Sequence, residues 1–162
     1  MAFKETAQKP SSHKHDLTTD VVNLPTCQAK RTTTQNISSN TFTYLDFNGT
    51  NWQKSITYET TGITVPKDGI YLIHAQVPWP FVSGQSGTKV MEVHLFTGST
   101  DNGIVVQDEL YNPGGLFLNN WHGMAKVNKG QKVRLGVFQN SSTGTIAVSA
   151  GAQLTVSWYC EQ

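Results

Sequence analysis

The stretch GITVPKDGIYLI, residues 62–73, decides the fold of this chain. A short apolar run ends at Pro66, a turn signal of Lys, Asp and Gly follows, and a second run then extends over residues 70–79. The odd positions of this second run, from 71 to 77, carry Tyr, Ile, Ala and Val without interruption. Apolar side chains with a period of two predict a β-strand that turns one face to a hydrophobic core.

The other face of the same strand is mixed and carries no charge. Its side chains are Ile70, Leu72, His74 and Gln76. A strand face that is exposed to water usually carries charged residues, so this composition favours burial of the face against protein. Two interpretations stay open at this point: contact with another chain, or a second buried layer in the same domain.

The rest of the chain repeats the strand signal. Only 14% of its 162 residues are charged, and Thr, Ser, Asn, Gln and Gly are abundant. Short strand-like runs recur from residue 29 onward, separated by Gly, Pro, Asn or Asp, and none has the period of an amphipathic helix. This pattern predicts an all-β sandwich or jelly roll of about eight to ten strands.

Several function classes are disfavoured by composition and motif. The net charge is +1 and there is no dense basic run, so we expect no nucleic-acid partner. No stretch approaches 18 apolar residues, so we expect no membrane insertion. Neither a G-x-S-x-G elbow nor a phosphate-binding glycine loop occurs, and we expect no enzyme, no catalytic residues, no metal site and no cofactor.

Residues 1–28 differ from the remainder. They hold two prolines and a single aromatic residue, Phe3, and show no strand or helix period. We interpret them as an extended N-terminal arm, with a disordered tail as the alternative. The first ten residues have no apolar core of a signal peptide, so we expect synthesis in a cytosol. The predicted domain therefore covers residues 29–162.

Three motifs in order resemble the tumour necrosis factor-like jelly rolls, a family that includes the globular heads of complement recognition subunits. They are residues 62–73, the segment 123–133 ending in KGQKV, and residues 149–154, SAGAQL. The resemblance implies a two-sheet antiparallel jelly roll that forms a compact homotrimer through one sheet. The chain departs from the family at Gln131, where an Asp is usual, and at His74, where some relatives have an aromatic residue.

The resemblance also implies site residues. The trimer contact would be formed by Leu72, His74, Gln76, Thr155, Ser157 and Tyr159. His74 would then lie near a threefold axis, where protonation would bring like charges together, or it would be an ordinary hydrogen-bonded interface histidine. In this fold the first and last strands are antiparallel neighbours, so Cys27 and Cys160 could form a disulfide, although cytosolic assembly would keep both reduced.

Aromatic residues in loops are the best candidates for ligand contact. We single out Trp52, Phe81 and Tyr111, because Trp and Tyr stack on sugars and anchor interfaces. Trp79 and Trp121 lie in strand-like runs, and we expect both in the core.

The functional expectation follows from the resemblance. Residues 32–37 and 42–47 resemble the version of this jelly roll found on bacteriophage heads and tails. We expect a non-enzymatic trimeric virion surface protein, a capsid decoration or head-fibre protein. It would be assembled in the host cytoplasm and anchored to capsid or tail proteins by residues 1–28. The alternative is a receptor-binding or lectin-like adhesin head, on a phage tail tip or in a secreted complement-type protein, that binds a host-surface glycan.

Overall fold

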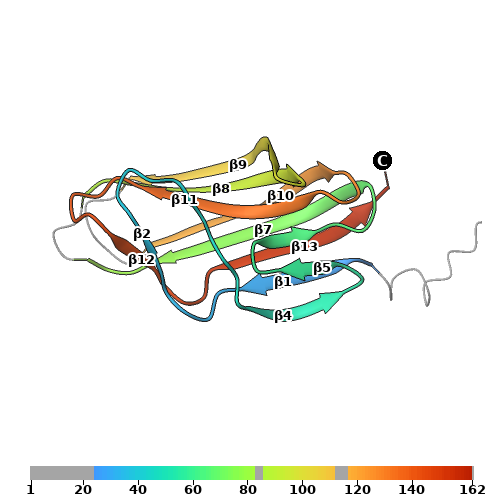
Figure 1. The fold of residues 1–162 in the computed structure, drawn as a ribbon, viewed down its shortest axis with the longest axis horizontal. Coiled ribbons are helices and arrows are strands. Elements are labelled where there is room, and N and C mark those ends of the chain that lie inside the picture. Colours follow the sequence, from blue (N-terminus) through green and yellow to red (C-terminus); the bar gives the residue numbers. More distant parts are fainter. Residues whose placement is uncertain (1–23, 83–85, 112–116, 162) are drawn as a thin grey trace, which may run out of the picture.

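The computed structural model describes residues 24–82, 86–111 and 117–161, and within these ranges all regular structure is β-strand. The strands form two layers that run along the long axis of the molecule (Figure 1). No helix that could cross a membrane occurs in the described part of the chain. The predicted arm lies outside the described residues up to position 23.

The first layer is a five-stranded antiparallel sheet. Its order is β10 (Phe117–Val127), β7 (Gly69–Trp79), β13 (Gln153–Cys160), β1 (Thr26–Lys30) and β4 (Gly49–Lys54). The run predicted over residues 70–79 is therefore β7, which lies between the last strand, β13, and β10. The predicted all-β sandwich is confirmed.

The second layer has the order β5 (Thr57–Glu59), β6 (Gly62–Thr64), β11 (Lys132–Gln139), β8 (Thr88–Thr97) and β9 (Thr100–Tyr111). The short strand β3 (Thr43–Tyr44) pairs with β11 beyond the end of β6. Two further strands, β2 (Gln35–Ile37) and β12 (Ile146–Val148), form a small ladder of their own.

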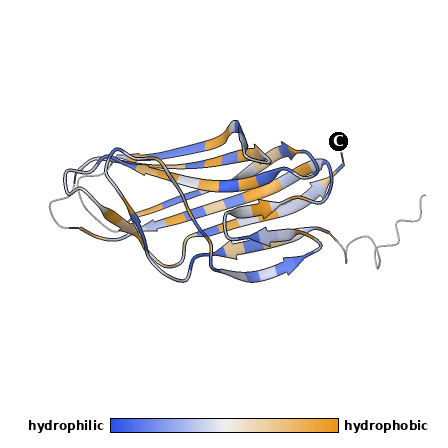
Figure 2. Ribbon diagram, in the orientation of Figure 1, coloured by the Kyte–Doolittle hydropathy of each residue, from blue (hydrophilic) through white to orange (hydrophobic). Residues whose placement is uncertain are grey.

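The core lies between the two layers, and alternation along the strands fills it. The odd residues of β7 from Tyr71 to Val77 are at most 1% exposed. Leu154 and Val156 of β13 join them from the same sheet, and the inner residues of β8 and β11 close the core from the other. Figure 2 shows the resulting alternation of hydrophobic and hydrophilic positions along the long strands. Of the two tryptophans expected in the core, Trp79 is fully buried and Trp121 packs against the core.

The turn before β7 shows why the motif needs its glycine. A Cβ at Gly69 would lie 2.5 Å from Trp158 Nε1 and 2.7 Å from the Cys160 carbonyl oxygen. The Lys67 ammonium lies 3.4 Å above the Trp158 ring, and the Tyr71 hydroxyl donates to the Lys67 carbonyl at 2.9 Å. The glycine thus lets the last strand close onto the turn, and Lys67 and Tyr71 hold it there.

A second glycine admits an aromatic ring to the outside of the second sheet. Gly136 lies in the middle of β11, where an added Cβ would collide with the Phe42 ring. The ring centroid of Phe42 lies 5.0 Å from that of Tyr44 and 5.3 Å from that of His94. Phe42 therefore covers both β11 and β8 from the outer side.

The boundary of the domain lies earlier than the sequence predicted. Strand β1 begins at Thr26, inside the range assigned to the arm, and Cys27 is fully buried in the core. The pattern of β1 was missed because only two positions of this short strand, Cys27 and Ala29, face the core, which is too few to show a period. The jelly roll therefore includes residues 26–28.

Candidate functional site

The outer side of the first sheet presents a broad surface that contains no Asp, Glu, Lys or Arg in its centre. We call it the uncharged face. Lys30, Lys54 and Lys126 lie at or next to the ends of their strands, around its margin. Its members are Thr26, Gln28, Leu72, His74, Gln76, Asn120, His122, Met124, Thr155 and Ser157.

Strand register brings the predicted contact residues into continuous rows. One row runs from Gln28 through Thr155 and His74 to His122. The next runs from Thr26 through Ser157 and Leu72 to Met124. Because cross-strand partners share a face, these rows are flat bands of neighbouring side chains.

The other predicted contact residues lie beside these rows. Gln76 stands opposite Gln153 of β13 and Asn120 of β10. Tyr159 lies at a register shift near the end of β13 and is 58% exposed. That the six residues contact another chain stays a prediction.

Polar groups on the uncharged face are bonded to one another. The hydroxyls of Thr26 and Ser157 are 2.7 Å apart, and Gln28 Nε2 donates to Thr155 Oγ1 at 3.0 Å. His74 Nε2 donates to Asn120 Oδ1 at 2.7 Å. A polar group that already has a partner costs much less to remove from water than a free one. The face is therefore suited to being covered.

Apolar side chains stand between these pairs. Leu72 is 44% exposed and Met124, its partner across the ladder, is 62% exposed. Burying them against another chain would contribute favourably at about 25 cal/mol per Å² of apolar surface. The contribution of β10 was not predicted from the sequence, because its inward positions include Asn119 and Gly123 and so lack the unbroken apolar face that identified β7.

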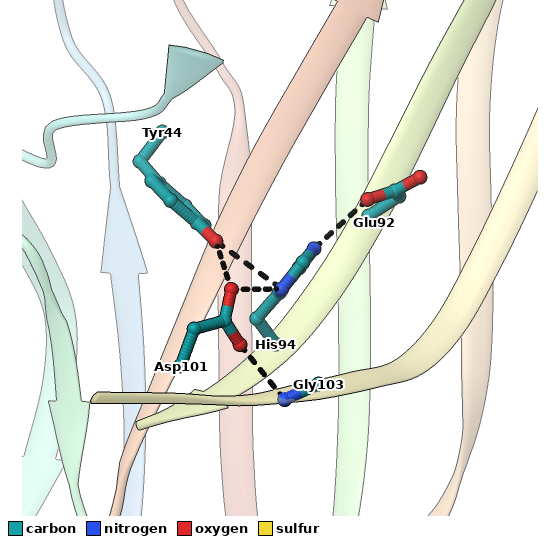
Figure 3. Close-up of polar contacts among 5 residues, drawn as sticks. All are labelled: Tyr44, Glu92, His94, Asp101 and Gly103. Carbon is teal, nitrogen blue, oxygen red and sulfur yellow. Dashed lines mark hydrogen bonds and ion pairs between the residues drawn. The ribbon is translucent and has the colours of Figure 1, made fainter. Parts of the chain in front are cut away.

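The outer side of the second sheet has the opposite character, as Figure 3 shows. His94 of β8 is buried between two carboxylates: Nε2 lies 2.8 Å from Glu92 Oε2, and Nδ1 lies 2.8 Å from Asp101 Oδ2. The Tyr44 hydroxyl donates to the same Asp101 oxygen at 2.7 Å. We call Tyr44, Glu92, His94 and Asp101 the charged cluster. Both ring nitrogens of His94 thus have a carboxylate partner.

The cluster joins three strands rather than holding a reactant. Burial raises the pKa of the Tyr44 phenol, and its hydrogen bond to Asp101 adds to this effect. Partial burial alone would raise the pKa of Asp101, but the Gly103 amide, the Tyr44 hydroxyl and the His94 ring all donate to it and hold its pKa below the usual value. The Arg134 guanidinium stacks 4.0 Å from the Tyr44 ring centroid. Each of the four side chains is hydrogen-bonded to another member of the cluster, which is typical of a structural pin.

The cluster was not found from the sequence, and part of it could have been. Glu92 and His94 are two residues apart on one strand, so they share a face. Tyr44 and Asp101 come from distant positions, and no local pattern joins them. Within residues 24–82, 86–111 and 117–161, no group of three or more His, Cys, Asp or Glu side chains is arranged to hold a metal ion.

The predicted disulfide is wrong. Both thiols are free, and register places Cys27 opposite Val156, four residues before Cys160. Four residues of strand span about 13 Å, which is beyond the reach of a disulfide. The two strands are antiparallel neighbours as the resemblance implied, but Cys160 extends past the start of β1 and pairs with Ile70 of β7.

The three aromatic ligand candidates do not form one site. Trp52 is 46% exposed on β4, level with the row through His74, and its Nε1 donates to Thr26 Oγ1 at 3.4 Å. Phe81 is 63% exposed and follows the end of β7. Tyr111 is 79% exposed and is the last residue of β9. A surface pocket of about 540 Å³ is lined by no aromatic residue; its lining residues are Lys67, Asp68, Lys126, Asn128 and Glu161.

Comparison with known proteins finds similarity only in three dimensions. No protein-family model and no curated protein sequence matches the chain. Among solved structures, the tumour necrosis factor Eiger from S. frugiperda superimposes with a TM-score of 0.64 and 11% identity, over 86% of this chain and 95% of that one. Murine APRIL at pH 5.0 superimposes with a TM-score of 0.65 and 13% identity, over 84% of this chain and 99% of that one.

These likenesses confirm the predicted architecture. Both structures cover most of the chain and nearly their own full length. The chain therefore has the tumour necrosis factor-like jelly-roll fold.

Proposed function

We propose that this chain is a non-enzymatic structural module that forms a homotrimer through its uncharged face. The observation that carries the proposal is the composition of that face: ten neighbouring side chains without a carboxylate, ammonium or guanidinium, two of which, Leu72 and Met124, are exposed apolar residues. The outer side of the second sheet differs in composition, because it carries the charged side chains Glu59, Glu92, Asp101 and Lys132.

Two physical arguments support the covering of the uncharged face by other copies of the same chain. The polar groups of the uncharged face are paired within it, so covering them leaves few donors without partners. The fold is also the one whose family resemblance implies a threefold contact through this sheet. Leu72, His74 and Thr155 then form the central strip of the contact.

The wider role we propose is at the surface of a virion. It rests on the resemblance of residues 32–37 and 42–47 to phage-type jelly rolls and on the arm that precedes β1. Twenty-five residues precede β1, and an extended chain of that length spans at most about 85 Å, enough to reach across a neighbouring capsid or tail subunit. A recognition head is less well supported, because the exposed aromatics are dispersed and the pocket has a charged lining.

Light scattering on the purified full-length chain tests the trimer. We expect a particle of three times the chain mass of 17.8 kDa, stable on dilution into the low micromolar range. A particle of the single-chain mass at all concentrations contradicts the proposal.

Amine cross-linking of purified virions tests the wider role separately. We expect Lys4, Lys9 or Lys14 of the arm to become joined to capsid or tail subunits, as read by mass spectrometry. Absence of the chain from the virions overturns the virion role and leaves the trimer unaffected.

A further inference from the structure

A lysine is buried inside the sandwich and forms no ion pair with any residue that the structure describes. The side chain of Lys89, on the inner face of β8, is 1% exposed. It takes part in none of the ion pairs found among the described residues. Its Nζ lies 5.3 Å from the Phe117 ring centroid and 5.9 Å from that of Trp79. Burying an ammonium in apolar surroundings disfavours its charged form, and burial lowers the pKa of Lys89.

A carboxamide is fixed in the same region from the opposite sheet. Asn119 of β10 is fully buried, and its Oδ1 accepts a hydrogen bond from Trp79 Nε1 at 2.7 Å. Its Nδ2 donates to Asp108 Oδ2 at 3.0 Å and to the Asp108 carbonyl at 3.3 Å. The amide is thus polarised at its oxygen by an indole N–H and has a carboxylate beside its nitrogen.

Trp79 links the amine to the amide. The Lys89 ammonium approaches its ring, and Asn119 is bonded to its Nε1. On the other side, β8 and β9 pair Met91 with Asp108 and Lys89 with Leu110. Lys89 and Asp108 are therefore diagonal neighbours on the inner face of one sheet, a spacing of about 7–8 Å between Cα atoms. Lys89 and Asn119 are buried at this end of the sandwich, and Asp108 is half-buried there.

We propose that Lys89 and Asn119 join in an intramolecular isopeptide bond. The neutral Lys89 amine attacks Asn119 Cγ, and the new Nζ–Cγ bond forms. The tetrahedral oxygen is stabilised by the Trp79 N–H. Asp108 takes a proton from the attacking amine and delivers it to Nδ2, the Cγ–Nδ2 bond breaks, and ammonia leaves. Atoms and electrons balance, and no oxidant or cofactor is needed.

The surroundings favour this reaction over hydrolysis. Asn119 and Trp79 are both fully buried, so water does not compete with the amine. The four-carbon stem of Lys89 lets Nζ leave the ring faces and reach the contact distance of about 3–3.5 Å that bond formation needs. The bond would tie β8 of one sheet to β10 of the other, which goes beyond self-association and would make the module resistant to forced unfolding.

Mass spectrometry of the folded full-length chain tests the bond. We expect the intact mass to be lower than the sequence mass by one ammonia. Tryptic digestion should give a branched peptide that contains both Lys89 and Asn119, with no cleavage after Lys89. Lys89→Met and Asn119→Ala should restore the full mass, and Asp108→Asn, which keeps the shape of the side chain, should leave most molecules unreacted.

Lys67→Met is the matched control, because Lys67 also stacks on a tryptophan but at the surface turn before β7. It should retain the loss of ammonia and the branched peptide. A folded wild-type chain with its full mass and a normal peptide ending at Lys89 overturns the proposal. So does a loss of ammonia that maps to another residue, or one that persists in Asp108→Asn at the wild-type level.

Discussion

The two outer faces of this sandwich are built on the same alternation and differ in what they expose. The uncharged face has neutral groups on four neighbouring strands that form hydrogen bonds with each other. The outer side of the second sheet has the charged cluster, and Lys132 forms an ion pair with Glu59 beside it. Removing ions from water costs several kcal/mol each unless they are well paired, whereas paired neutral groups cost little. Charge distribution, more than hydrophobicity, thus identifies which sheet is fit to meet another chain.

The largest effect is expected from a charge placed in the middle of the uncharged face. Thr155→Arg puts a guanidinium between Gln28 and His74, where three copies would each have to desolvate it. We expect the trimer to dissociate to monomers at micromolar concentration, measured by sedimentation velocity. Gln107→Arg makes the same change on the other outer face, opposite Glu92, and should leave the trimer intact. Equal dissociation of both variants would remove the distinction between the faces.

Loss of the charged cluster should reduce stability without affecting assembly. His94→Leu removes the partner of Glu92 and one partner of Asp101, which we expect to cost about 1–3 kcal/mol in the free energy of unfolding. Denaturant unfolding in the monomeric Thr155→Arg background measures this loss of stability without a contribution from trimer dissociation. His122→Leu changes an exposed histidine of the uncharged face and should stay within about 0.5 kcal/mol. A similar loss in both variants would contradict the assignment of the pin.

Acid should act through the charged side of the molecule. The hydrogen bond from Lys132 holds the pKa of Glu59 below its usual value, and the pKa of Asp101 is also lowered. A lowered folded-state pKa contributes stability above the unfolded value, which is lost as pH falls through the folded value. We therefore expect the free energy of unfolding to fall below about pH 4, with a shallower fall in a Glu59→Gln, Asp101→Asn double variant. An unchanged slope would show that neither carboxylate contributes.

The smallest perturbation is thiol labelling, which leaves the fold intact. Burial raises the pKa of Cys27 to about 11, so this thiol should be inert to a disulfide reagent at pH 8 until the chain unfolds. Cys160 is partly exposed beside Ile70 and should react in the native state. Faster labelling of Cys160 in Thr155→Arg than in the wild type would show that the covered area extends to the end of β13. Equal labelling rates of Cys160 in the two proteins would mean that the covered area is confined to the centre of the uncharged face.

The fold could be predicted from the sequence where one strand shows both an apolar inward face and an uncharged outward face. In β7, alternation predicted the core on one side and the uncharged face on the other, and both are found. It was insufficient where a contact depends on register between distant strands. The offset that separates Cys27 from Cys160 is set by the length of β13 beyond β1, and the approach of Tyr44 to Asp101 depends on where β3 docks. Neither the offset between the two cysteines nor the contact between Tyr44 and Asp101 can be predicted from the periodicity of a single strand.

The ring of Phe42 over Gly136 has a consequence for the order of folding. The Phe42 ring contacts His94 of β8 as well as Gly136 of β11. Its packing site therefore forms only after those two strands have paired. Residues 40–47 also lie about ninety positions from β11 along the chain, and such distant contacts form late. We therefore expect the Leu45 amide, which donates to the Leu135 carbonyl, to gain protection in pulse-labelled hydrogen exchange after the β8–β11 amides do. Protection that appears simultaneously would instead mean that the whole sandwich condenses in one step.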